Sequence, residues 1–329
     1  MKKYLHVFFF LLAAGILIAG CGKSGAQIEQ KAVAQSVSPQ INGKIAYSWT
    51  GFAEKPYGER TGVCVLEGGN IKKYPDISYA RWSGEDLMLG FVGHVTREQT
   101  YNTLEKIDVN TRQMENSFKI PRGIGRYLIL SLGKRMLVQM SEQKNKKFTD
   151  NLAILDTQTN ELKKITSNPI GEPWLIHGYD FNERNQLIVY SQEDHTKLRS
   201  AVIRIINLRG EIIQELPLKG ATDPHWSPDG KKIVFVLPYL DYPNSNRANL
   251  NITLFDLDSK ETERLTKHPG IETQPVFSPD GKQIAYVLWG AGGRANNLAV
   301  INIDGTGFQT LLPEDHIRQG QVSNPDWGA

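Results

Sequence analysis

The chain has 329 residues, of which 40% are hydrophobic and 22% are charged, the composition of a folded protein rather than of a disordered one. Two of its 38 basic residues lie in a predicted N-terminal leader, so the rest of the chain carries 36 basic groups against 35 acidic ones. This near balance argues against nucleic-acid binding and against general adhesion to anionic lipid.

The first twenty residues have the features of a bacterial signal peptide. Two lysines follow Met1, and residues 5–18 form a nearly unbroken apolar run. That run is shorter than the roughly 20 residues that a membrane-spanning helix needs, which argues against an uncleaved span. The sequence Ile18-Ala19-Gly20-Cys21 resembles the bacterial lipobox. The resemblance implies cleavage before Cys21 and acylation of that cysteine with a diacylglyceryl group and palmitate.

Residues 21–40 are predicted to be a flexible tether. The segment is rich in Gln, Ala and Ser, and it lacks aromatic residues and apolar periodicity. Cys64 is the only other cysteine, and its apolar neighbours predict a small buried side chain. Because Cys21 is expected to be acylated, we expect no disulfide.

Internal repetition dominates the remainder of the chain. Residues 223–235 and 274–286 share a Pro-x-Trp/Phe segment, a Ser-Pro-Asp-Gly turn and an apolar strand. In this turn, Pro presets the first corner and Gly takes the position of positive φ. Weaker copies occur elsewhere, and the six key positions are separated by 48, 51, 45, 51 and 50 residues. They are Trp82, Leu130, Phe181, Trp226, Phe277 and Trp327.

The two ends of the chain hold complementary parts of one repeat. Residues 324–327 read Asn-Pro-Asp-Trp, the opening of a repeat, whereas residues 42–47 read as its continuation. The spacing fits four strands per blade of a propeller. We therefore predict, for residues 41–329, an all-β, six-bladed β-propeller with four-stranded blades. Pairing of the C-terminal strand with the first blade is expected to close it.

The repeat Pro-x-Trp/Phe-Ser-Pro-Asp-Gly-Lys resembles that of TolB-like propellers, most strongly in residues 223–235 and 264–286. The resemblance covers residues 41–329. TolB proper also has an N-terminal α/β domain, for which residues 22–40 leave no room. We therefore expect a TolB-like propeller alone, and the resemblance does not bring the role of TolB in the Tol–Pal system with it.

Signatures of catalysis are missing from the sequence. It contains no G-x-S-x-G nucleophile elbow and no H-E-x-x-H, and its histidines are scattered. His225 adjoins Trp226 and is expected to be structural, whereas His268 and His316 precede inner strands and are the candidates for the channel. Asp229 and Asp280 supply one carboxylate per turn, far fewer ligands than Ca²⁺ takes. We predict no enzyme, no cofactor and no metal site.

The predicted binding face lies opposite the Ser-Pro-Asp-Gly turns. There, the loops between the second and third strands of the blades are long and carry aromatic and arginine residues, which favour binding surfaces. The candidates are Phe52, Tyr57, Arg60, Arg97, Tyr101, Phe148, Tyr239, Tyr242, Arg247, Trp289 and Arg294.

Together these features predict a monomeric lipoprotein, anchored through Cys21 on the extracytoplasmic face of the cell membrane, that binds a protein or peptide at the envelope. A propeller hydrolase or lyase acting on cell-wall or extracellular glycan is the alternative. A third hypothesis is an inhibitory or sensory accessory to a membrane protein encoded nearby.

Overall fold

A computed structural model describes most of the expected propeller, and these residues belong to one compact unit. The described residues are 41–51, 60–83, 85–95, 100–119, 124–130, 134–239, 249–268, 270–290 and 296–329. The predicted signal peptide (1–20), Cys21 and the tether (21–40) lie outside them. None of the helices in these ranges has the length and apolar character to cross a membrane.

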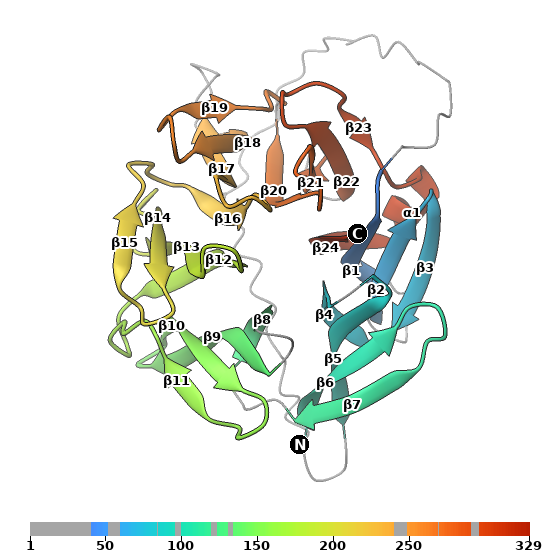
Figure 1. Ribbon diagram of the computed structural model, residues 1–329, viewed down its shortest axis with the longest axis horizontal. Helices are drawn as coiled ribbons and strands as arrows, with labels where there is room; N and C mark the ends of the chain where they lie inside the picture. Colours follow the sequence, from blue (N-terminus) through green and yellow to red (C-terminus); the bar gives the residue numbers. More distant parts are fainter. Residues whose placement is uncertain are drawn as a thin grey trace, which may run out of the picture. The chain divides into compact units, whose positions relative to one another are not determined.

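The described chain is almost entirely β-structure, arranged in five sheets that follow one another along the sequence (Figure 1). The first sheet has the order β24 (Gly320–Gly328), β1 (Lys44–Gly51), β2 (Arg60–Glu67) and β3 (Asn70–Pro75). The second contains β4 (Ile77–Trp82), β5 (Leu87–Val95), β6 (Thr100–Asp108) and β7 (Met114–Lys119). The third contains β8 (Ile124–Leu130), β9 (Arg135–Lys144), β10 (Lys147–Asp156) and β11 (Leu162–Lys164).

The remaining strands form one sheet of four strands and one of eight. The four-stranded sheet contains β12 (Trp174–Asn182), β13 (Leu187–Asp194), β14 (Val202–Asn207) and β15 (Ile212–Glu215). The larger sheet begins with β16 (Thr222–Trp226), β17 (Lys232–Tyr239), β18 (Asn249–Asp256) and β19 (Thr262–Arg264). It continues with β20 (Ile271–Phe277), β21 (Gln283–Trp289), β22 (Asn296–Asn302) and β23 (Gln309–Thr310). A short helix, α1 (Glu314–Gln319), precedes β24.

The all-β propeller fold is confirmed, but the predicted six four-stranded blades do not appear as six sheets: the described strands form five. Four sheets have four strands, whereas β18 and β20 join in a single sheet through one parallel pair, Leu250 with Ile271. The reason is a buried carboxylate one residue further on. Glu272 accepts hydrogen bonds from the backbone N–H of Ile252 (3.1 Å) and from the side chain of Asn251 (3.2 Å). These bonds hold the start of β20 against β18.

This carboxylate leads to a prediction about pH. Burial raises the pKa of Glu272, although hydrogen bonds from Thr266 and Asn251 oppose the rise. The stability contributed by its protonated form is complete below the pKa of an unfolded glutamate, about 4.3, and is lost as the pH rises through the higher folded pKa. Urea unfolding between about pH 4 and pH 8 should show the wild type losing stability relative to Glu272→Gln as the pH rises. A difference that stays constant with pH would contradict this assignment.

The two Ser-Pro-Asp-Gly segments form the turns that the sequence predicts. In the first, the Ser227 hydroxyl donates to the Asp229 carboxylate at 2.6 Å, and Gly230 has a φ of 71°. In the second, Ser278 donates to Asp280 at the same distance. Each carboxylate also accepts a backbone N–H two residues further on. The aspartates therefore stabilise the turns between the first and second strands of their sheets.

The last strand of the chain pairs with the first. β24 runs antiparallel to β1, with Trp327 opposite Ile45, and the indole Nε1–H of Trp327 donates to the carbonyl of Asn42 at 2.8 Å. Gly43 has a φ of 92°, and a Cβ there would collide with the carbonyl oxygen of Gly328. The backbone at this junction therefore requires glycine at position 43.

The core consists of clusters between neighbouring sheets. One cluster joins side chains of β1, β2 and β24 to side chains of β20, β21 and β22. Residues 233–236 of β17 are consecutive, yet all are fully buried, because both faces of the strand are covered. Cys64 is a free, buried thiol in the cluster that joins β1, β2 and β24 to β20, β21 and β22. Burial raises the pKa of this thiol to about 11.

Candidate functional site

A β-bulge recurs in the first strand of each four-stranded sheet. It also occurs in β16 and β20, which begin the two halves of the eight-stranded sheet. In five of these strands the residue three positions before the key aromatic has positive φ, and the pairing register shifts beside it. These residues are Tyr79, Gly178, Asp223, Gln274 and Asn324. The bulges turn the next residues of each strand toward their neighbours.

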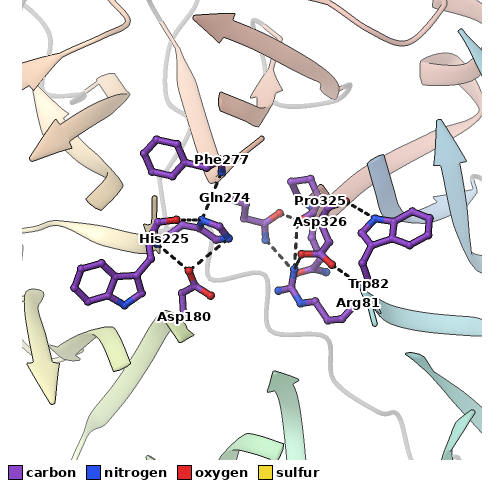
Figure 2. A network of polar contacts seen from close by, with 10 residues as sticks. Arg81, Trp82, Asp180, His225, Gln274, Phe277, Pro325 and Asp326 are labelled. Atoms are coloured by element: carbon purple, nitrogen blue, oxygen red, sulfur yellow. Dashed lines mark hydrogen bonds and ion pairs between the residues drawn. The ribbon is translucent and has the colours of Figure 1, made fainter. Parts of the chain in front are cut away.

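A polar contact between consecutive repeats follows each of two bulges (Figure 2). The residue before the aromatic is Asp326 in β24, and its carboxylate accepts the backbone N–H of Trp82 at 2.7 Å and Arg81 at 3.2 Å. The Trp82 indole N–H returns a bond to the Asp326 carbonyl at 3.1 Å. In the same way Asp180 accepts the backbone N–H of Trp226 at 2.8 Å.

The junction between β16 and β20 uses a histidine instead of a carboxylate. His225 Nδ1 lies 3.5 Å from the backbone N of Phe277 and 3.0 Å from the carbonyl O of Trp226, and its Nε2 lies 3.5 Å from Asp180 Oδ2. At the junction between β20 and β24, the equivalent residue is Val276, whose side chain has no hydrogen-bond acceptor. There the Gln274 side chain accepts the backbone N–H of Asn324 at 2.7 Å.

These contacts satisfy donors that the sheets leave free. Ser278 N–H bonds to Gln283 O in the ladder, so the neighbouring Phe277 N–H points away from β21. The same alternation holds for Trp226, because the ladder bond is made by Ser227 N–H to Lys232 O. At these four junctions the first strand of a repeat is therefore hydrogen-bonded to the first strand of the preceding repeat rather than left open.

A hollow of about 910 Å³ lies at the turn end of these strands, and we call it the mouth. Its size falls within the ordinary range for ligand pockets, about 300–1,000 Å³. Its aromatic lining comes from the repeat motif itself: Trp82 and Phe181 are half-buried, whereas Trp226, Phe277 and Trp327 are buried and contribute only their edges. Its ionisable lining comprises Glu85, Asp180, Glu183, Arg184 and His225.

A second, much smaller cavity of about 50 Å³ lies among the bulges, where there is room for no more than a few waters. The bulge residues Gly178, Asp223, Gln274 and Asn324 line it, together with Arg81 and His225 among others. A macromolecular ligand can therefore occupy the mouth but not this inner cavity.

Three of the predicted loop-face residues have described side chains, and their contacts are mainly internal. Arg264 stacks over the ring of Tyr239 at 4.0 Å, and the Tyr239 hydroxyl lies 3.1 Å from Thr253 Oγ1. Trp289 packs against the core, with its indole N–H 3.4 Å from Thr273 Oγ1. Phe148 is half-buried on β10.

The side chains of the other loop-face candidates lie outside the part of the chain that the structure describes. Arg60 and Tyr101 lie in β2 and β6, but their side chains are outside the description. The remaining candidates fall outside the described residues altogether: Phe52, Tyr57, Arg97, Tyr242, Arg247 and Arg294. The loop face therefore stays a prediction.

The two histidines considered for the channel differ in burial. His316 is buried in α1, 3.1 Å from the Tyr47 hydroxyl, and burial lowers the pKa of its imidazole. His268 is exposed, and its carbonyl accepts the Asn251 side chain. Across the ranges that the structure describes, no three His, Cys, Asp or Glu residues are grouped to hold a metal ion.

Fold and repeat together define a β-propeller whose repeat resembles that of TolB. No family model matches the chain. By sequence it is 30% identical over 80 residues to the Tol-Pal system protein TolB of Francisella tularensis, which is 24% of this chain but only 17% of that relative's length. By structure it resembles TolB from Acinetobacter baumannii, with a TM-score of 0.63 and 21% identity, over 87% of this chain and 66% of that one.

A second solved structure, a protein assigned as TolB from Agrobacterium tumefaciens, shares the fold at a TM-score of 0.57 and 13% identity. That match covers 82% of this chain and 90% of the other. The chain is thus similar to TolB in sequence over a quarter of its length and in fold over most of it.

Proposed function

We propose that the protein is a membrane-anchored lipoprotein whose propeller binds a protein or peptide partner at the cell envelope, without catalysing a reaction. The observation that carries the proposal is the mouth, a hollow of about 910 Å³ lined by aromatic and charged side chains. Aromatic and arginine side chains are the favoured anchors of protein interfaces. Acylation of Cys21 would place the protein on the extracytoplasmic face of the membrane, as a monomer tethered by residues 21–40.

The proposed propeller has six blades. The strands β16–β19 and β20–β23 repeat the same antiparallel order, and one parallel residue pair joins them. Counting them as two blades gives six with the four smaller sheets. The pairing of β24 with β1 then closes the propeller through a blade shared by both ends of the described chain. The TolB relatives support an envelope setting, and we extend it to this chain as part of the proposal.

The alternative of a glycan hydrolase or lyase rests on the acid–histidine pair of Asp180 and His225 at the mouth. Both side chains already hold backbone groups of neighbouring strands: Asp180 accepts Trp226 N–H, and His225 lies within 3.5 Å of Phe277 N. A general acid or base needs a polar atom available to the substrate. Their structural engagement therefore favours binding over catalysis.

Charge reversal at the mouth tests the proposal. Glu183 and Arg184 are exposed on the turn between β12 and β13, so Glu183→Lys with Arg184→Glu should fold normally. In intact cells, cross-linking followed by mass spectrometry should recover a defined envelope partner, and this double variant should lower its yield by about tenfold. Glu263→Lys, exposed on β19, is the matched control and should leave the yield unchanged.

The same experiment separates the two faces. Lys146→Glu changes an exposed turn between β9 and β10, at the loop end of the third sheet. If only this variant reduced capture, the loop face and not the mouth would be the binding surface. If none of the variants changed capture, the mouth would have no role in binding.

A further inference from the structure

His225 faces more hydrogen-bonding groups than one imidazole can satisfy (Figure 2). Its Nδ1 lies 3.0 Å from the carbonyl of Trp226, an acceptor, and 3.5 Å from the backbone N–H of Phe277, a donor. A ring nitrogen either donates or accepts, so these two contacts exclude each other. On the other side of the ring, Nε2 lies 3.5 Å from Asp180 Oδ2, which only accepts when ionised.

The protonation state of the imidazole ring decides which of these partners His225 can hydrogen-bond. With a proton on Nε2 alone, His225 donates toward Asp180 and accepts Phe277 N–H through Nδ1. With a proton on Nδ1 alone, it donates to Trp226 O and turns the Nε2 lone pair toward the Asp180 carboxylate. Only the doubly protonated ring can donate to both Trp226 O and the Asp180 carboxylate. In that state Phe277 N–H has no acceptor on His225.

The charged groups around His225 come from three elements. Asp180 approaches from β12, next to Tyr179, and Glu183 and Arg184 follow at the end of the same strand. Asp223 belongs to β16 itself, and Arg81 of β4 lines the inner cavity with His225. From β20, the residues that line the two cavities with His225 carry no charge: Gln274, Pro275, Val276 and Phe277.

We propose that His225 is a pH-sensitive latch between β16 and β20 at the mouth. Taking up the second proton transfers Nδ1 from Phe277 N–H to Trp226 O and releases the end of β20 at Phe277 from β16, while Glu272 still holds the start of β20 against β18. Histidine is the side chain whose charge ordinarily changes between pH 5 and pH 8. Because His225, Trp226 and Phe277 all line the mouth, the shape of the mouth follows this exchange. The inference rests on the proposed function only in treating the mouth as the binding site.

Amide hydrogen exchange tests the latch directly on the protein without a partner. We expect the protection factor of the Phe277 amide, corrected for intrinsic exchange, to fall by about three- to tenfold between about pH 7.5 and about pH 5.5. The Trp82 amide is the matched control, because it makes the equivalent bond to Asp326 at 2.7 Å with no histidine involved. Its protection should not change.

The variant His225→Gln supplies the second comparison. Its amide oxygen can accept Phe277 N–H but does not titrate, so the pH dependence at Phe277 should disappear; His225→Asn serves if that variant folds poorly. Protection of Phe277 that is independent of pH in the wild type would overturn the latch. So would a fall shared equally by Trp82, or one that persists in His225→Gln. Because no partner is needed, these results are independent of the capture experiment that tests the proposed function.

Discussion

Replacing Trp327 by alanine should lower the free energy of unfolding by about 3–5 kcal/mol, the usual cost of truncating a buried aromatic side chain. Only 8% of Trp327 is exposed, and the indole packs in the cluster that joins the first sheet to β20–β22. Its loss also leaves the carbonyl of Asn42 without the 2.8 Å bond from the indole N–H. Urea unfolding followed by circular dichroism measures the effect.

The position of Trp327 makes this effect large. β24 belongs to the end of the chain, and its pairing with β1 joins residues that are 269 to 284 positions apart in the sequence. Gln321→Ala, on the same strand and half-buried, is the matched control and should cost well under 1 kcal/mol, as substitutions outside the core usually do. Equal unfolding midpoints for the wild type and Trp327→Ala would show that the pairing of the chain ends does not support the fold.

The sequence predicts two features well, the Ser-Pro-Asp-Gly turns and the pairing of the last strand with the first. A Ser-Pro-Asp-Gly turn needs only its own residues: Asp229 bonds to Ser227 and to the N–H of Lys231, all within five positions. The pairing of the last strand with the first is also visible in the sequence, because the two parts of one motif stand at opposite ends. In both cases the identities of the residues in the motif are enough to predict the structure.

The bulges show where sequence reasoning reaches its limit. Five different residue types occupy one left-handed position, although such a conformation costs a non-glycine residue roughly 1–2 kcal/mol. Tyr79 and Gln274 have no local preference for it. The contacts made by the following residues, such as Asp326 to Trp82 N–H, offset this cost, and these contacts exist only between repeats.

The candidate site was missed for the same reason. Sequence reasoning favoured the loops, where aromatic and basic residues stand close together along the chain. The mouth is instead assembled from residues about fifty positions apart, among them the key aromatic residues of the repeats, which the sequence indicates only as structural positions. His225 adjoins a core tryptophan and was expected to be structural, yet it also lies beside Asp180 and Phe277 at the surface of the mouth.

Replacing Cys21 by serine should move the protein from the membrane fraction to the soluble fraction almost completely. Each buried CH₂ of an acyl chain contributes about 0.8 kcal/mol to membrane binding, so a diacylated cysteine anchors durably, whereas serine at this position carries no thioether-linked lipid. The near-neutral charge of the chain after the predicted leader offers no electrostatic substitute for the proposed anchor. Fractionation of cells, with metabolic labelling by a palmitate analogue, measures both the location and the lipid.

Cys64→Ala is the control that separates the two cysteines. Cys64 is buried, and burial raises the pKa of its thiol to about 11, so it is a poor nucleophile for acylation. The alanine variant should keep the label and the membrane location. If Cys21→Ser retained the label, or if Cys64→Ala lost it, the proposed acylation of Cys21 would be wrong. A Cys21→Ser protein that resists extraction from the membrane by carbonate would mean that something other than this acyl group holds the propeller there.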